Sequence, residues 1–158
     1  MPSSEQQSDL GILLAAAYQE FVRELHAAHA AAGFTDLGRS DGFVFRSLAG
    51  GPMTVSDLAG HLEISKQGAA QIIDDMQRRG YVERVADPAD RRARPVRLTA
   101  RGQAALANAR RFHRAYERRL VRQHGAEAVG TLRVILTAAA AAAGPGRGVD
   151  PRLRPLYL

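Results

Sequence analysis

Apolar residues near the start of this chain recur at every third or fourth position. Between residues 9 and 32 they stand at Leu10, Leu14, Ala17, Phe21, Leu25 and Ala28. This spacing predicts one long amphipathic helix, capped at Ser8 or Asp9 and ended by Gly33. The stripe is long for a helix that serves only its own small domain, so it can equally face a second subunit.

Three shorter helical patterns follow, separated by residues that break helices. The first runs from Ser40 to Leu48 and ends at Gly50-Gly51-Pro52. The next two are capped by Thr54 and Ser65 and meet at a tight turn, Glu63-Ile64. Their inward positions are Phe43, Val44 and Leu48, then Val55, Leu58, Ala59 and Leu62, then Ala69, Ile72, Ile73 and Met76.

The pattern then changes to strands and returns to helices. Residues 81–86 and 95–99 have strand character and enclose D-P-A-D-R-R-A-R, which predicts a hairpin with a long tip. A second long helix is expected from Thr99 to about His124, and a last one over residues 126–143, with Val129, Leu132, Ile135, Leu136 and Ala139 inward. The predicted fold is mainly α with a small β-hairpin wing, that is, a winged helix-turn-helix flanked by long helices.

The net charge of the chain indicates the kind of partner that it binds. The 158 residues carry a net charge of +6, with 22 basic and 16 acidic groups. Residues 1–51 carry −3, residues 52–102 carry +2 and residues 103–158 carry +7. This balance favours an anionic partner, either nucleic acid or a membrane surface.

Several classes of protein are disfavoured by what the sequence lacks. There is no cysteine for a disulfide, a thiolate metal site or a redox sensor. The polar N-terminus does not resemble a signal peptide, and no apolar run reaches membrane-spanning length, so we expect a cytoplasmic protein. No nucleophile–base set, Gly-rich phosphate loop or catalytic carboxylate pair is present, so we expect neither an enzyme nor a cofactor.

The helix that begins after Ser65 has the composition of a helix that reads DNA. The major groove admits one α-helix, whose first residues reach the base edges. Ser65, Lys66, Gln67 and Gln71 supply polar side chains there, and Gln can pair with adenine while Lys reaches guanine or phosphate. Gly68 keeps the start of the helix slim.

The hairpin tip supplies a second candidate contact. Arg91, Arg92 and Arg94 stand on a narrow ribbon that can enter the minor groove, and Asp90 can orient a neighbouring guanidinium. Taken separately, the helix pair is also typical of a buried core and the arginines of a solvated loop. Their occurrence in this order within fifty residues favours DNA.

Two segments together resemble the MarR family of bacterial transcriptional regulators. They are L-A-G-H-L-E-I-S-K-Q-G-A-A-Q-I-I-D-D-M-Q-R-R-G-Y-V-E-R and D-P-A-D-R-R-A-R-P-V-R-L-T-A-R-G. The second matches the family's wing signature, an Asp-x-Arg followed by a strand that ends Leu-Thr-x-x-Gly. These positions are Asp90, Arg92, Leu98, Thr99 and Gly102 here.

The resemblance implies a homodimer on a pseudo-palindromic DNA operator, most simply as a repressor. Residues 1–34 and 103–143 would form the dimerisation helices, residues 35–102 the DNA-binding lobe, and residues 144–158 an irregular tail outside the family pattern. This apolar-ended tail is expected to dock, with a partner subunit as one candidate surface. On the family pattern Ser65, Lys66, Gln67 and Gln71 enter the major groove, Arg92 enters the minor groove beside Asp90, and the phosphate candidates are Arg84, Arg94 and Arg97. Pro95 departs from the pattern, because it removes a backbone donor from the second wing strand.

The resemblance also implies a small, often anionic aromatic effector, bound in a crevice between the dimer helices and the winged lobe. The candidate lining residues are Phe21, His29, Phe43, Arg46 and His113. Plain core packing is the alternative for the two phenylalanines, and an acidic neighbour is the alternative partner of Arg46. A metal-responsive regulator that uses His26, His29 and His113, and a DNA-binding protein without any effector, are the rival readings.

Overall fold

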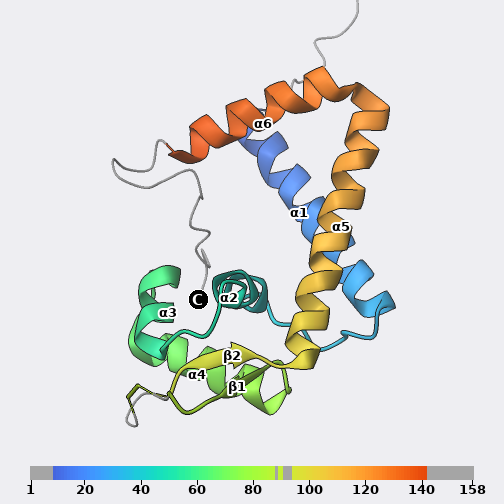
Figure 1. Cartoon of the computed structure of the whole chain (residues 1–158). Helices are drawn as coiled ribbons and strands as arrows, with labels where there is room; N and C mark the ends of the chain where they lie inside the picture. The colour runs from blue at the N-terminus through green and yellow to red at the C-terminus, as the bar shows by residue number, and fades with distance from the viewer. Residues whose placement is uncertain (1–8, 88, 91–93, 142–158) are drawn as a thin grey trace, which may run out of the picture. The chain divides into compact units, whose positions relative to one another are not determined.

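The structure is a computed structural model in which residues 9–87, 89–90 and 94–141 are described. The chain divides into two units, residues 1–37 and residues 38–158, and each is described by itself. The elements are α1 (Leu10–Ala31), α2 (Asp41–Leu48), α3 (Val55–Leu62), α4 (Lys66–Arg78), β1 (Val82–Arg84), β2 (Val96–Leu98), α5 (Ala100–His124) and α6 (Ala126–Ala141). The predicted fold class, mainly α with a small hairpin, is confirmed (Figure 1).

The first unit consists of α1 and the turn that ends it. Gly33 adopts φ +86°, and the N–H of Phe34 donates to the carbonyl of His29 at 2.9 Å, as in a helix stopped by glycine. Asp9 stands at the N-cap but its side chain makes no capping hydrogen bond. The first half of α1 exposes large apolar side chains, including Leu10 at 72% and Tyr18 at 61%. This half therefore presents an apolar surface to its surroundings.

The core of the second unit lies among α2, α3, α4 and the hairpin, at one end of α5 (Figure 1). The predicted inward positions of α3 and α4 are buried at Leu58, Ala59, Leu62, Ala69, Ile73 and Met76, whereas Val55 and Ile72 are only half-buried. In α2 the prediction was partly wrong. Phe45 rather than Phe43 is the buried ring, and it meets Tyr81 edge-on at 5.6 Å.

Three hydroxyl side chains cap the N-termini of three helices, as the sequence indicates. The N–H of Asp57 donates to Thr54 Oγ1 at 3.1 Å, that of Gly68 to Ser65 Oγ at 3.0 Å, and that of Gly102 to Thr99 Oγ1 at 3.1 Å. Each bond satisfies a backbone donor that the first turn leaves without a partner. The turn between α3 and α4 is made by Glu63, whose φ of 53° is left-handed.

The hairpin is shorter than predicted because its outer residues serve the adjoining helices. Val82 pairs with Leu98 and Arg84 with Val96 in an antiparallel register. Tyr81 instead donates its N–H to Met76 at the end of α4, and Thr99 caps α5. Met53, which the sequence pattern did not place in the sheet, pairs with Val96 from the other side through two hydrogen bonds of 3.0 and 2.7 Å.

α6 leaves the far end of α5 at Gly125, whose φ is +87° (Figure 1). Its predicted inward residues Leu132, Ile135 and Leu136 are 43–57% exposed in the single chain, and Val129 is half-buried. The inward prediction is therefore wrong for an isolated chain. Among the described helices, none is long and apolar enough to cross a bilayer.

Gly102 lets α5 approach the hairpin closely, and this predicts an unusual response to alanine. A Cβ at this position would lie 2.1 Å from the carbonyl oxygen of Tyr81. We expect Gly102→Ala to lower the free energy of unfolding by about 1–3 kcal/mol, as overpacking does. Urea denaturation measures this change.

The matched control is Gly60→Ala in α3, where an added Cβ meets nothing within 4 Å. It should raise stability by up to about 1 kcal/mol through helix propensity. Equal effects of the two substitutions would contradict the close contact at Gly102.

Candidate nucleic-acid interface

The first turn of α4 presents polar side chains on an anchored helix. Ser65, Lys66, Gln67 and Gln71 are all exposed. The opposite face is held in the core by Ala69, Ile73 and Met76, each at most 1% exposed. The helix therefore offers long, polar side chains on a rigid support, as a groove-reading helix requires.

A buried ion pair fixes the other end of α4, and sequence reasoning missed it. Arg79 Nη1 donates to Asp41 Oδ2 at 2.6 Å and Nη2 donates to Asp41 Oδ1 at 3.1 Å. The side chain of Asp41 is 3% exposed, and its Oδ2 also accepts the N–H of Gly38 at 2.8 Å. This bidentate pair joins the first turn of α2 to the last turn of α4. An acidic residue at a helix start was the only sequence signal.

Neighbouring groups extend this ion pair. Asp75, one turn before Arg79, accepts from Arg79 Nε at 2.9 Å and from Arg78 Nη2 at 3.1 Å. Hydrogen bonds from Arg79 and Arg78 lower the pKa of Asp75, and the hydrogen bond to Asp41 raises the pKa of Arg79. The guanidinium carbon of Arg79 also lies 5.6 Å from the centre of the Tyr81 ring. The charges at the end of α4 are thus held in one network.

Two of the three arginines predicted to contact phosphates, Arg84 and Arg97, form ion pairs within the lobe. Arg84 of β1 donates to Asp74 of α4 at 2.6 Å, and Arg97 of β2 donates to Glu83 at 2.7 Å. The first pair connects the hairpin to α4, and the second connects its two strands to each other. Asp90 and Arg94 are exposed, whereas Arg91 and Arg92 lie outside the described residues.

The predicted effector residues fall in both units. Phe21 and His29 belong to α1, where His29 is buried and its ring meets Phe34 edge-on at 6.1 Å. In the second unit Phe43 is half-buried, and Arg46 lies close enough to His113 to act on it. Loss of solvent, and then the charge of Arg46, lower the pKa of His113. No cluster of three His, Cys, Asp or Glu suited to a metal occurs in the part of the chain that the structure describes.

The Asp41–Arg79 pair predicts a large loss of stability on a small change. Asp41→Asn removes the charge that faces a mostly buried guanidinium, so the free energy of unfolding should fall by about 3 kcal/mol. Glu83→Gln, which breaks an exposed pair, should cost less than about 1 kcal/mol and serves as the control. Chemical denaturation of both variants at neutral pH gives the comparison, and equal losses would refute a special role for Asp41.

The depressed pKa of His113 predicts a pH effect with a definite sign. Its unfolded value is 6.5 and its folded value is lower, so the unfolded chain takes up the proton first as the pH falls. The free energy of unfolding should decrease as the pH falls through 6.5 toward the folded pKa. NMR titration of the His113 ring measures that pKa, and Arg46→Gln should raise it. If the pKa of His113 did not change in this variant, the charge of Arg46 would not be a cause of the lowered value.

Part of the chain matches a known protein family. Residues 35–93 match the model of the MarR family. An uncharacterized HTH-type transcriptional regulator of Bacillus subtilis (strain 168), YsmB, is 38% identical over 56 residues, which are 35% of this chain and 38% of that protein. The match thus spans less than half the length of this relative.

Two solved structures share the fold over most of the chain. FabT of Streptococcus pneumoniae, in complex with DNA, has a TM-score of 0.74 at 20% identity, covering 84% of this chain and 93% of FabT. The transcriptional repressor CouR, bound to a 23-mer DNA duplex, has a TM-score of 0.65 at 26% identity, covering 83% and 92%. Residues 35–93 are thus similar to the MarR family, and the chain shares the winged helix-turn-helix fold of the DNA-bound repressor CouR.

Proposed function

We propose that this protein is a sequence-specific DNA-binding transcriptional regulator. The observation that carries the proposal is the exposed polar first turn of α4 on a helix whose opposite face and C-terminal end are both fixed. A rigid recognition helix keeps its side chains in register with base edges. Ser65, Lys66, Gln67 and Gln71 are the side chains we assign to the major groove.

The hairpin supplies the contacts outside the major groove. We assign Arg92 to the minor groove, with Arg91 beside it and Asp90 as the carboxylate that orients the wing. Arg84, Arg94 and Arg97 are assigned to phosphates. The carboxylate partners of Arg84 and Arg97 do not prevent this, because a guanidinium has five N–H donors and can bind a phosphate as well.

A homodimer on a pseudo-palindromic operator is the form in which we propose that the lobe acts. Residues 1–34 and 103–143 would form the dimerisation helices, and the exposed leucine and isoleucine side chains of α1 and α6 support this assignment. Two recognition helices would then enter major grooves about one helical turn apart. The DNA complexes of FabT and CouR support a duplex as the partner.

We further propose that a small anionic aromatic ligand tunes DNA release, with repression as the mode of regulation. CouR is described as a repressor, and the proximity of Arg46 and His113 supplies a cationic group beside an imidazole for such a ligand. Phe43 is a third candidate from the same unit, and Phe21 and His29 are the candidates from the first unit. DNA binding without an effector is the alternative, and DNA affinity measured with and without candidate aromatic acids distinguishes the two.

Gln67 provides the test of sequence reading. Gln67→Ala should reduce the ratio of specific to non-specific DNA affinity by about 10-fold or more, because one base contact is worth roughly 1–3 kcal/mol. Fluorescence anisotropy with the operator and with a scrambled duplex at one salt concentration measures the ratio. Gln77→Ala, an exposed glutamine near the other end of α4, is the control and should leave it unchanged.

An equal loss on both duplexes would place Gln67 on the phosphate backbone instead. A variant that binds both duplexes as the parent does would remove Gln67 from the interface. Genomic footprinting of the parent protein supplies the operator used in these measurements.

A further inference from the structure

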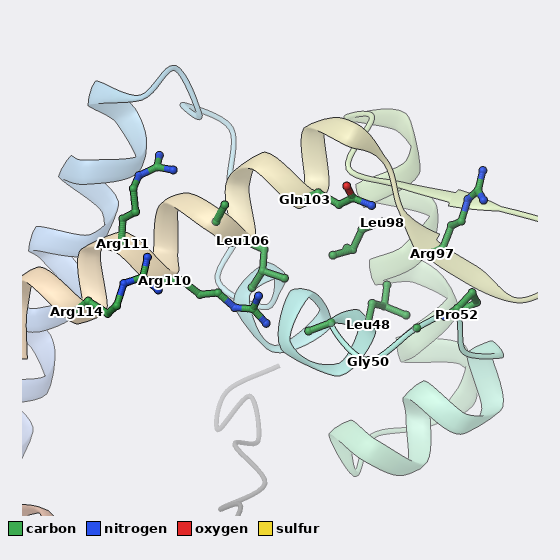
Figure 2. Close-up of a pocket in the computed structure, with 13 residues that line it drawn as sticks. Leu48, Gly50, Pro52, Arg97, Leu98, Gln103, Leu106, Arg110, Arg111 and Arg114 are labelled. Atoms are coloured by element: carbon green, nitrogen blue, oxygen red, sulfur yellow. The ribbon is translucent and has the colours of Figure 1, made fainter.

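Lys66, the first residue of α4, is the only lysine among the 158 residues of the chain. The other 21 of the 22 basic residues are arginines. Figure 2 shows four of them on β2 and α5, around a hollow beside the end of α2: Arg97, Arg110, Arg111 and Arg114. We propose that Lys66 is an acylation site, at which an activated acyl group, from a thioester or an acyl phosphate, removes the positive charge and weakens DNA binding. This inference rests on the proposed function, because it concerns the regulation of the same helix.

The chemistry of the two basic side chains decides which of them is acylated. A lysine amine that has lost its proton is a nucleophile, whereas a guanidinium is not deprotonated in proteins. In the reaction the ammonium of Lys66 gives a proton to water, and the free amine attacks the acyl carbonyl carbon. A C–N bond forms and the C–S bond of the thioester, or the C–O bond of the acyl phosphate, breaks. The thiolate or phosphate leaves, and the nitrogen gives a second proton to water. No other side chain in the sequence offers an amine for this reaction.

The amine of Lys66 is accessible to such a donor. The residue is exposed, and within the described parts of the chain its side chain forms no ion pair or hydrogen bond. The neighbouring Ser65 is occupied with the backbone, since its Oγ accepts the N–H of Gly68 at 3.0 Å. The amine is therefore reached without breaking a contact that holds the fold. Because the N-terminal end of a helix is electropositive, loss of the ammonium charge there also does not destabilise α4.

Lys66 supplies the only formal positive charge over a long part of the surface assigned to DNA. Residues 60–77, from the end of α3 through most of α4, contain this one cation and three carboxylates, Glu63, Asp74 and Asp75. Asp74 and Asp75 accept hydrogen bonds from arginines outside this stretch. Acylation changes the formal charge of the stretch from −2 to −3, so a single reaction removes the one group in it that attracts a phosphate backbone by charge.

Acylation also changes the shape and the donors of the turn that faces the DNA. The ammonium has three N–H donors, and the amide that replaces it has one. The first turn of a helix in the major groove lies against base edges, so the acyl group takes up room that the DNA needs. The buried face of α4 at Ala69 and Ile73 is not involved. Acylation of Lys66 and DNA binding should therefore exclude each other while the fold stays intact.

Treatment of the full chain with acetyl phosphate and, separately, with acetyl coenzyme A tests the proposal and distinguishes the two sources. Peptide mass spectrometry should find Lys66 acetylated by at least one donor, at a rate similar to that of the side chain of Nα-acetyl-lysine amide. A saturating operator duplex should slow acetylation of Lys66 but not of the free lysine derivative. In fluorescence anisotropy the acetylated chain should bind the operator about tenfold or more weakly, with an unchanged melting temperature.

Three variants serve as controls. Lys66→Arg keeps the charge but offers no amine, so treatment with the donor should leave its operator affinity unchanged, which also tests any effect of the α-amino group. Lys66→Gln imitates the neutral amide and should bind about as weakly as the acetylated chain. Arg78→Gln removes the same charge from the exposed far end of α4 and should weaken binding much less.

Three results would overturn the proposal. In the first, Lys66 stays unmodified with both donors while the free lysine derivative reacts. In the second, the acetylated chain binds the operator as the parent does. In the third, treated Lys66→Arg loses affinity as the treated parent does. Failure of the untreated parent to bind any duplex is a different result, because it overturns the proposed function itself.

Discussion

The ion pair between Asp41 and Arg79 is the interaction on which the geometry of the winged lobe depends. Apolar packing holds one face of α4, but such packing is not directional and permits small rotations. A bidentate pair with a carboxylate that is 3% exposed is directional and cannot be broken without leaving a charge in a place that water hardly reaches. It therefore sets the orientation of α4 against α2, and with it the direction in which Ser65 to Gln71 project.

Short contacts also connect the wing to α4 and to the segment before α3. Arg84 joins β1 to Asp74 of α4, and Val96 of β2 pairs on both sides, with Arg84 and with Met53. At the start of α5, Thr99 caps the helix and Gly102 lets it approach Tyr81. A displacement of α5 is thus passed to the hairpin and to the α2–α3 connection.

Local rules were sufficient for most of the fold and for part of the site. The hydroxyl caps at Thr54, Ser65 and Thr99, and the stop at Gly33, were all predictable, because each depends only on residues within one turn of the helix end. The exposed first turn of α4 followed from the same periodicity. Strand ends and the choice of Phe45 over Phe43 did not follow, because neighbouring elements compete for the same backbone groups and the same space.

The sequence by itself determined the order of the helices, the hairpin, the likeness to one family over residues 35–93 and the polar side chains exposed on the first turn of α4. These properties are encoded in spacing, caps and a local motif. Only the tertiary structure decided which charges neutralise one another and which do not. Asp41 meets Arg79 across 38 positions of the chain, whereas Arg110 and Arg114 meet no carboxylate among the described residues. The physical reason is that ion pairing depends on distance in space, and residues far apart in sequence come within reach only when the core has packed.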